Sequence, residues 1–174
     1  FAQDVDIDNV TSDNSWLKIG LNSGLPIGDA GDFASFTLGL DVKGQFLVNP
    51  NFGIGVASGY THVFAKDGGE DFGIVPLAGF ARYYFQPKGL FIGADFGYGF
   101  LTNVENNSGG LYLNPQIGYH NDDWNFFAYY QNTFTENEVD IQVVGIGATY
   151  NLIFSLKSKY KRKRAVFTAL FFVK

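Results

Sequence analysis

Residues 144–154 read Val-Gly-Ile-Gly-Ala-Thr-Tyr-Asn-Leu-Ile-Phe. Every second residue from Val144 to Phe154 is apolar, whereas the positions between them hold mostly glycine and polar residues. Apolar residues at every second position are typical of a β-strand that has one face against an apolar environment. The segment therefore predicts a long strand with two chemically different faces.

The same alternation recurs from Ser15 onward and predicts eight strands in all. They span residues 15–25, 33–48, 52–64, 73–85, 90–101, 110–120, 124–134 and 141–154. Each is long enough to cross a bilayer as a tilted strand, which takes roughly 9–11 residues. Tight turns at 49–51, 86–89 and 121–123 alternate with longer, acidic connections. Short periplasmic turns and longer outer loops are typical of an up-and-down barrel, so we predict an all-β, eight-stranded antiparallel barrel.

The two faces of these strands differ in bulk and charge. One face carries seventeen aromatic rings and no Asp, Glu, Lys or Arg. The other carries most strand glycines, several amides and the charged residues Lys18, Asp41, Lys43, Arg82 and Asp95. The interior of an eight-stranded barrel is only wide enough for side chains to fill it, so the polar, glycine-rich face fits inside. The aromatic face then points outward to lipid, which predicts a transmembrane barrel; a soluble ligand-binding barrel would need the inverse arrangement.

Aromatic residues of the apolar face gather near both ends of the predicted strands. Tyr83, Phe85 and Trp124 lie at the turn side, and Phe36 and Phe64 lie at the loop side. Two aromatic belts are typical of the two membrane interfaces.

Two prolines, Pro76 and Pro115, fall inside predicted strands. Proline lacks the N–H that a strand donates to its neighbour, and a closed barrel has no free edge to accommodate the loss. We therefore expect β-bulges at both positions.

The charge of the chain is segregated. Residues 1–154 hold all 17 acidic residues and five basic ones, a net charge of −12, whereas 155–174 hold seven basic residues and no acidic one. We predict a barrel domain at 15–154 and a basic, apolar tail at 155–174, which is either a contact for anionic headgroups or peptidoglycan, or a non-native extension. Residues 1–14 form an acidic lead-in, and Ala2 marks either the remnant of a secretory signal peptide or an arbitrary boundary.

The eight alternating segments, with the last one ending in Phe154, resemble the small outer-membrane β-barrel family that includes OmpA-like, OmpX-like and Ail-like proteins. The resemblance covers 15–154. It implies a Gram-negative host, a location in the bacterial outer membrane, and contact with the outer-membrane assembly machinery through the terminal strand. It does not imply one activity, because members act as adhesins, envelope anchors, narrow channels and lipid-modifying enzymes.

The sequence offers little for catalysis. The two histidines, His62 and His120, fall on opposite faces and opposite ends of the barrel, and neither has a serine two residues later. A serine hydroxyl that acts as a nucleophile needs a base such as histidine close by. We therefore assign no catalytic residue, and a lipid-modifying enzyme is disfavoured. The chain has no cysteine, and its acidic residues lack the spacing of a calcium loop, so no metal or cofactor is expected. The negative charge of the barrel segment opposes nucleic-acid binding.

Two groups of residues remain as candidate sites. The lumen charges Lys18, Asp41, Lys43, Arg82 and Asp95 predict either a paired network that fills the barrel or an ion path. The outer loops carry acidic residues that could recognise a host or extracellular ligand, namely Asp67, Glu70, Asp71, Glu136, Glu138 and Asp140. We expect a monomer in contact with outer-membrane lipid and lipopolysaccharide, with an envelope-structural or adhesin-like role through these loops. The alternative is a narrow, porin-like channel for small solutes or ions.

Overall fold

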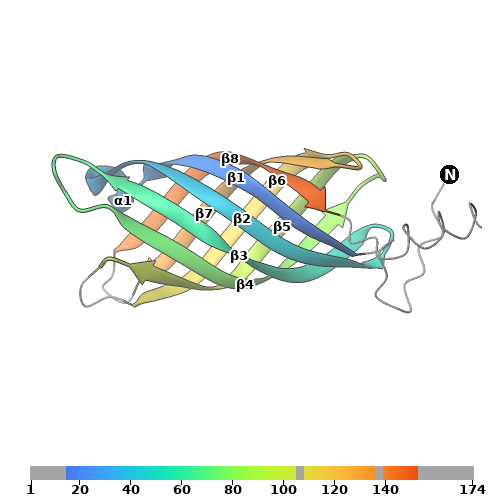
Figure 1. The fold of residues 1–174 in the computed structure, drawn as a ribbon, viewed down its shortest axis with the longest axis horizontal. Helices are drawn as coiled ribbons and strands as arrows, with labels where there is room; N and C mark the ends of the chain where they lie inside the picture. The colour runs from blue at the N-terminus through green and yellow to red at the C-terminus, as the bar shows by residue number, and fades with distance from the viewer. Residues whose placement is uncertain (1–14, 105–107, 136–138, 153–174) are drawn as a thin grey trace, which may run out of the picture.

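The computed structural model describes residues 15–104, 108–135 and 139–152. Its strands are β1 (Ser15–Ile27), β2 (Ala34–Asn49), β3 (Phe52–Ala65), β4 (Phe72–Tyr84), β5 (Gly89–Thr102), β6 (Gly109–His120), β7 (Trp124–Thr135) and β8 (Asp140–Leu152), and a helix α1 (Asp29–Phe33) follows β1. Each strand is antiparallel to the next, and β8 pairs with β1, so the sheet closes on itself (Figure 1). The predicted eight-stranded antiparallel barrel is confirmed.

The described strand ends differ from the predicted ones by two residues or fewer. Ile153 and Phe154, predicted to complete the last strand, lie outside the described residues, as do the segments 1–14 and 155–174. Within the ranges that the structure describes, no helix is long and apolar enough to cross a membrane.

The barrel has two different ends. At one end, which we call the turn end, short turns join β2 to β3, β4 to β5 and β6 to β7, and β1 begins. At the other, the loop end, α1 and the longer connections gather, on the left of Figure 1. This alternation follows from Pro, Asn, Asp and Gly in the short turns, which supply the backbone geometry that a tight reversal needs.

The alternation of the sequence is preserved around the sheet by the strand register. Leu21 of β1 lies opposite Leu40 of β2 and Ala148 of β8, so apolar residues meet apolar residues on the outer face. Leu21 is 68% exposed and Ile146 is 71% exposed, whereas the inward Lys43 is only 1% exposed. The large apolar side chains therefore point outward, and the charged ones point into the barrel.

Aromatic side chains pack against one another near both ends of the outer face. Phe36 stacks on Phe64 near the loop end, with ring centroids 4.1 Å apart. Trp124 contacts Tyr150 near the turn end at 5.1 Å. The two groups lie where the two membrane interfaces would meet the barrel.

The expected bulges at Pro76 and Pro115 are wrong. On each side of Pro76 the pairs Ser58–Leu77 and Thr61–Ile74 keep the same register, and only the pairs between them are missing. The β6–β7 ladder is interrupted in the same way around Pro115. A proline removes a donor without adding a residue, so the ladder loses pairing locally but does not shift. The register shifts lie in β2 instead, near Ala34 and Leu47.

Candidate functional site: the lumen network and the acidic loop end

Among the lumen charges, Lys18 and Arg82 lie nearest the turn end. Lys18 lies three residues after the start of β1 and Arg82 lies two residues before the end of β4. The Lys18 Nζ donates to Asn125 Oδ1 at 3.1 Å and to Asn151 Oδ1 at 2.9 Å. The Arg82 Nη1 donates to the same Asn125 Oδ1 at 3.5 Å. Four strands thus bring two buried cations and two amides together.

The only buried ion pair among the described residues lies nearer the middle of the barrel. Lys43 Nζ and Asp95 Oδ2 are 2.5 Å apart, and both side chains are almost fully buried. The same Asp95 oxygen accepts bonds from Asn114 Nδ2 at 3.1 Å and from Gln116 Nε2 at 3.0 Å. A buried carboxylate with three donors has the compensation that desolvation requires.

Gln116 joins these two layers into one network. Its Nε2 donates to Asp95, and its Oε1 accepts from Arg82 Nη2 at 3.1 Å. A continuous chain of hydrogen bonds therefore runs from Lys43 in β2 to Lys18 in β1 across the interior. Its members come from seven of the eight strands, so the network links distant parts of the sheet.

The structure places all five predicted lumen charges inside the barrel but pairs them differently from the expectation of mutual charge pairing. Only Lys43 and Asp95 form an ion pair; within the described ranges Lys18 and Arg82 are held by amide oxygens. Asp41 lies beside Asn22 and does not join the chain of hydrogen bonds described above. Amides such as Asn125 and Gln116 take the place of carboxylates beside these cations. The sequence did not assign them to the network, because strand alternation places an amide inside the barrel without identifying its hydrogen-bond partner.

Aromatic side chains fill the space around the network. Six large inward residues are between 0% and 6% exposed, namely Phe80, Tyr84, Phe91, Tyr112, Phe127 and Tyr129. The Arg82 guanidinium lies 4.5 Å from the centroid of the Phe91 ring, and the Lys43 ammonium lies 5.7 Å from that of Phe80. Rings at these distances attract cations through their negative faces. These rings therefore occupy the lumen beside the network.

The loop half of the lumen holds an apolar cluster that the sequence did not identify. It consists of Ala30, Ala34, Val63, Phe72, Ile74 and Ile141. Ala30 belongs to α1 and is fully buried, so the helix covers the loop end of the barrel interior. The sequence predicted only a longer, acidic connection here. Gly28 adopts φ 58°, which favours glycine, just before the helix begins.

The acidic loop residues lie on the surface of the loop end. Asp67, Glu70 and Asp71 are exposed in the connection between β3 and β4, and Asp140 is half-buried at the start of β8. Glu136 and Glu138, predicted to act with them, lie outside the described residues. Two further exposed carboxylates, Asp29 and Asp32, come from α1. Acidic side chains from separate loops therefore share this end of the barrel.

One of these acids, Asp71, ties its loop to the barrel. Its Oδ1 accepts the Ala65 N–H at 2.8 Å, and its Oδ2 contacts His62 Nε2 at 3.1 Å. His62 Nδ1 is in turn 3.2 Å from the Tyr60 hydroxyl. The bond from Ala65, followed by that from His62, lowers the pKa of the Asp71 carboxyl. His62 lies at the outer rim, as predicted, and its ring nitrogens are engaged in this tether.

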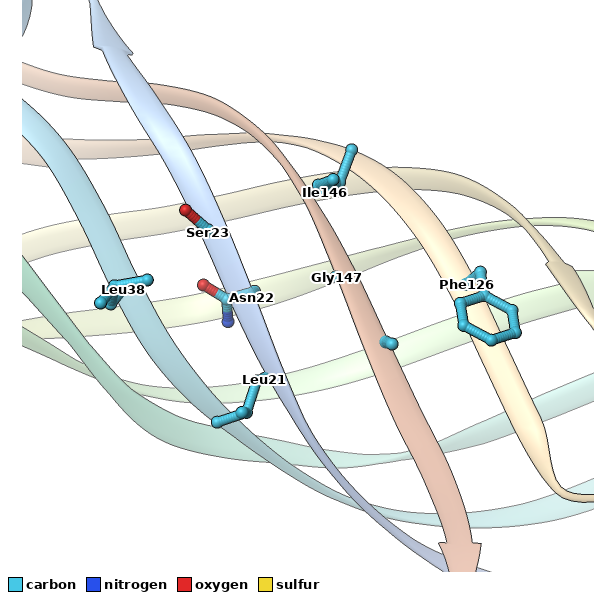
Figure 2. A pocket seen from close by; sticks show the side chains of 8 residues that line it. Leu21, Asn22, Ser23, Leu38, Phe126, Ile146 and Gly147 are labelled. Carbon is cyan, nitrogen blue, oxygen red and sulfur yellow. The ribbon is translucent and has the colours of Figure 1, made fainter.

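An open hollow of about 330 Å³ lies on the lipid-facing side of the barrel (Figure 2). Leu21 and Ser23 come from β1, Leu38 from β2, Phe126 from β7 and Ile146 from β8. None of its lining residues carries a charge. The hollow arises where small residues lie between large ones on a surface built for acyl chains, and it offers no group for catalysis.

No protein-family model matches the chain, and no curated protein sequence matches it. Solved structures do match in fold. Ail, the attachment invasion locus protein of Yersinia pestis, gives a TM-score of 0.56 at 13% identity, over 80% of this chain and 98% of that one. Neisserial surface protein A gives 0.54 at 12% identity, over 83% of this chain and 100% of that one. A de novo designed transmembrane β-barrel gives 0.51 at 17% identity, over 79% and 95%.

These identities are low, so the likeness is one of fold. It covers nearly the whole of each matched chain, including that of a de novo designed transmembrane β-barrel. By its fold, the protein is an eight-stranded transmembrane β-barrel like those of small bacterial outer-membrane proteins.

Proposed function

We propose that this chain is an integral protein of a bacterial outer membrane whose loop end binds a positively charged partner without catalysing a reaction. The observation that carries the proposal is the concentration of carboxylates at the loop end. Six acidic residues and one basic residue, Lys66, lie in the described part of this end. A surface with one sign of charge attracts partners of the opposite sign and speeds their association.

The framework beneath these carboxylates is held in place. Lys66 donates from its amine to the Gly31 carbonyl and from its backbone N–H to the Phe33 carbonyl, so the β3–β4 loop is attached to α1. The Asp71 tether holds the other side of the same loop. A fixed array of charge loses less entropy on binding than a flexible one.

The negative charge of this end also bears on which ligands it can bind. A structure of Yersinia pestis Ail, similar to this chain with a TM-score of 0.50 and 15% identity, contains the heparin analogue sucrose octasulfate. A sulfated polyanion would be repelled by the carboxylates on the loop end here. We therefore propose a preference for cationic partners over sulfated ones.

Binding of charged probes to the full chain in phospholipid nanodiscs tests this proposal. We expect a fluorescent poly-lysine peptide to bind at the loop end. A heparin oligosaccharide can bind only through the basic segment 155–174, so substitutions at the loop end should not reduce heparin binding. Replacing Asp67 and Glu70 with Asn and Gln should weaken poly-lysine binding, and raising the salt concentration should weaken it further.

The matched control neutralises two exposed carboxylates at the opposite end, Asp122→Asn with Asp123→Asn, and should leave poly-lysine binding unchanged. Both ends of the barrel are accessible in a nanodisc, so the comparison assigns binding to one of them. Equal loss of poly-lysine binding in both variants, or heparin binding that the loop-end substitutions reduce, would contradict the proposal. Absence of any binding would leave an envelope-structural role.

The two other functions considered from the sequence have less support. A narrow channel needs a water path, and inward aromatic rings and the apolar cluster occupy the interior. A lipid-modifying enzyme needs a reactive group, and His62 is engaged in holding Asp71.

A further inference from the structure

The charges inside the barrel do not balance. Three cations, Lys18, Lys43 and Arg82, face two carboxylates, Asp41 and Asp95, which leaves one positive charge in excess. Lys43 has the Asp95 carboxylate at 2.5 Å. Within the described residues, no carboxylate oxygen lies within 4.0 Å of Lys18 or Arg82. The excess charge therefore belongs to these two residues.

Lys18 and Arg82 converge on a single neutral atom. Asn125 Oδ1 is 3.1 Å from Lys18 Nζ and 3.5 Å from Arg82 Nη1. Lys18 is 2% exposed and Arg82 is 1% exposed, so solvent does little to screen their mutual repulsion. Two buried cations that share one amide oxygen lack the compensating charge that such burial requires.

Arg82 also keeps an unused hydrogen-bond donor. Its Nε is buried and has no hydrogen-bond partner, although its Nη atoms donate to Gln116 and Asn125. The rings of Phe80, Phe91 and Phe127 lie 4.5–6.0 Å from the guanidinium carbon. An arginine N–H enclosed by rings and left without an acceptor points to a ligand that accepts hydrogen bonds.

We propose that a small monovalent inorganic anion, such as chloride, binds between Lys18 and Arg82 in the turn half of the barrel. One negative charge brings the lumen to neutrality. The anion accepts from the Lys18 ammonium and from the Arg82 Nε–H, and it relieves the repulsion that Asn125 alone cannot.

The position of the site lets an ion reach it from the periplasmic side. At the turn end, β1 and β7 begin and β8 ends. Lys18 and Asn125 lie within three residues of the start of their strands, and Asn151 is the penultimate residue of β8. Trp16, the next inward residue of β1 toward the turn end, is only half-buried. An ion can therefore exchange at the turn end without passing the Lys43–Asp95 layer or the apolar cluster.

Bromide, which replaces chloride and scatters X-rays anomalously, tests the site directly. Crystals of the wild-type chain grown in bromide should show an anomalous peak within hydrogen-bond distance of Lys18 Nζ and Arg82 Nε. The variant Lys18→Met, which keeps the length of the side chain but removes its charge, should lose that peak. A wild-type map with no peak at this position would overturn the proposal.

Stability in vesicles provides a second test that needs no crystal. At constant ionic strength, chloride should replace isethionate, a bulky anion, in steps. The urea concentration at the midpoint of unfolding of the wild-type chain should then rise, and the rise should saturate as the binding site fills. Asn125→Asp supplies a fixed negative charge at the site and should abolish the chloride effect. Gln131→Glu adds the same charge to the loop half of the lumen and should leave the effect intact.

The outcomes separate the site from a general salt effect. A chloride effect lost in Asn125→Asp and kept in Gln131→Glu supports the anion site. A wild-type midpoint that is the same in both salts, or an effect equally lost in both variants, would overturn it. If Asn125→Asp fails to fold, the wild-type titration and the bromide map still decide, because neither depends on a variant.

Discussion

The turn half and the loop half of the barrel interior are filled by different kinds of side chain. Toward the turn end, buried charges and amides bond to one another in a network that reaches from Lys18 to Asp95. Toward the loop end, Val63, Ile74 and Ile141 pack under the α1 residue Ala30. Both halves meet the requirement that the interior be full, but the first must match hydrogen-bond partners and the second must match only shape. The two halves should therefore respond differently to substitution.

The largest effect is expected in the network. Asp95→Asn leaves the buried Lys43 without a counter-charge and should lower the free energy of unfolding by about 3–5 kcal/mol. Urea unfolding in lipid vesicles measures this loss. The double variant Lys43→Met with Asp95→Asn removes both charges and should recover most of the stability. If the double variant were as unstable as the single one, the charge pair would not be the source of the effect.

The contrast between the halves rests on the polar face being the inner one, and Ile146→Arg tests this premise. A charge at this lipid-facing position near the middle of β8 should destabilise the barrel by roughly 2–4 kcal/mol in vesicles. The adjacent Gly147→Arg should act through crowding instead, because a Cβ atom there would lie 2.5 Å from the Phe127 ring. If vesicles of different thickness changed the Gly147 variant more than the Ile146 variant, the assignment of faces would be reversed.

A smaller loss is expected in the loop half. Ile74→Val removes one methylene from a fully buried residue and should lower the free energy of unfolding by about 0.5–1.5 kcal/mol. Thr149→Val in the turn half is the matched change, since the buried Thr149 hydroxyl has no partner among the described residues. Replacing that hydroxyl with a methyl group should be neutral or stabilising. A larger loss at Thr149 than at Ile74 would mean that its hydroxyl has a role the packing does not reveal.

The surface of the loop end should respond to pH through Asp71. Its pKa is lowered because the ionised carboxylate accepts from Ala65 and His62, so the tether is complete above the ordinary pKa of about 3.9 and is lost as pH falls below it. The amide shift of Ala65, followed by NMR in detergent from pH 6 to pH 2, should titrate with a midpoint below that value. Asp71→Asn should remove the titration. A midpoint above 3.9 would contradict the lowered pKa.

The smallest effect is expected on ion conductance across a planar bilayer. Rings and the hydrogen-bond network fill the turn half, so the wild-type chain should show no stable conductance steps. Ile74→Ala enlarges the space in the loop half of the lumen. This variant should also show no conductance steps, because the turn half still blocks the path. Large, stable steps from either protein would favour the channel function.

The sequence predicts the strands well because their period is local. The alternation in 15–25 already identifies β1, although the strand continues through Pro26, which pairs with Val143. The helix α1 was missed because its glycines outweigh the signal of a single turn of helix. The bulges at Pro76 and Pro115 were wrong because local chemistry does not say whether a ladder shifts or only loses pairs.

The contents of the lumen were predictable, but their partners were not. Parity alone places Lys18 inside. Its contact with Asn125 joins residues 107 positions apart, and its contact with Asn151 joins residues 133 apart. Such contacts depend on the closure and stagger of the barrel, which fix the residues that face each other across the interior.

The interrupted pairing at Pro76 and Pro115 has a mechanical consequence. The two interruptions lie in the β3–β4 and β6–β7 ladders, so they divide the cylinder into an arc of β4, β5 and β6 and a wider arc of the other five strands. A wall that lacks two residue pairs in each of two ladders bends most easily at those two places. When the surrounding bilayer thins or compresses the wall, its cross-section should flatten by small rotations of the two arcs, and the ladders within each arc should keep their shape.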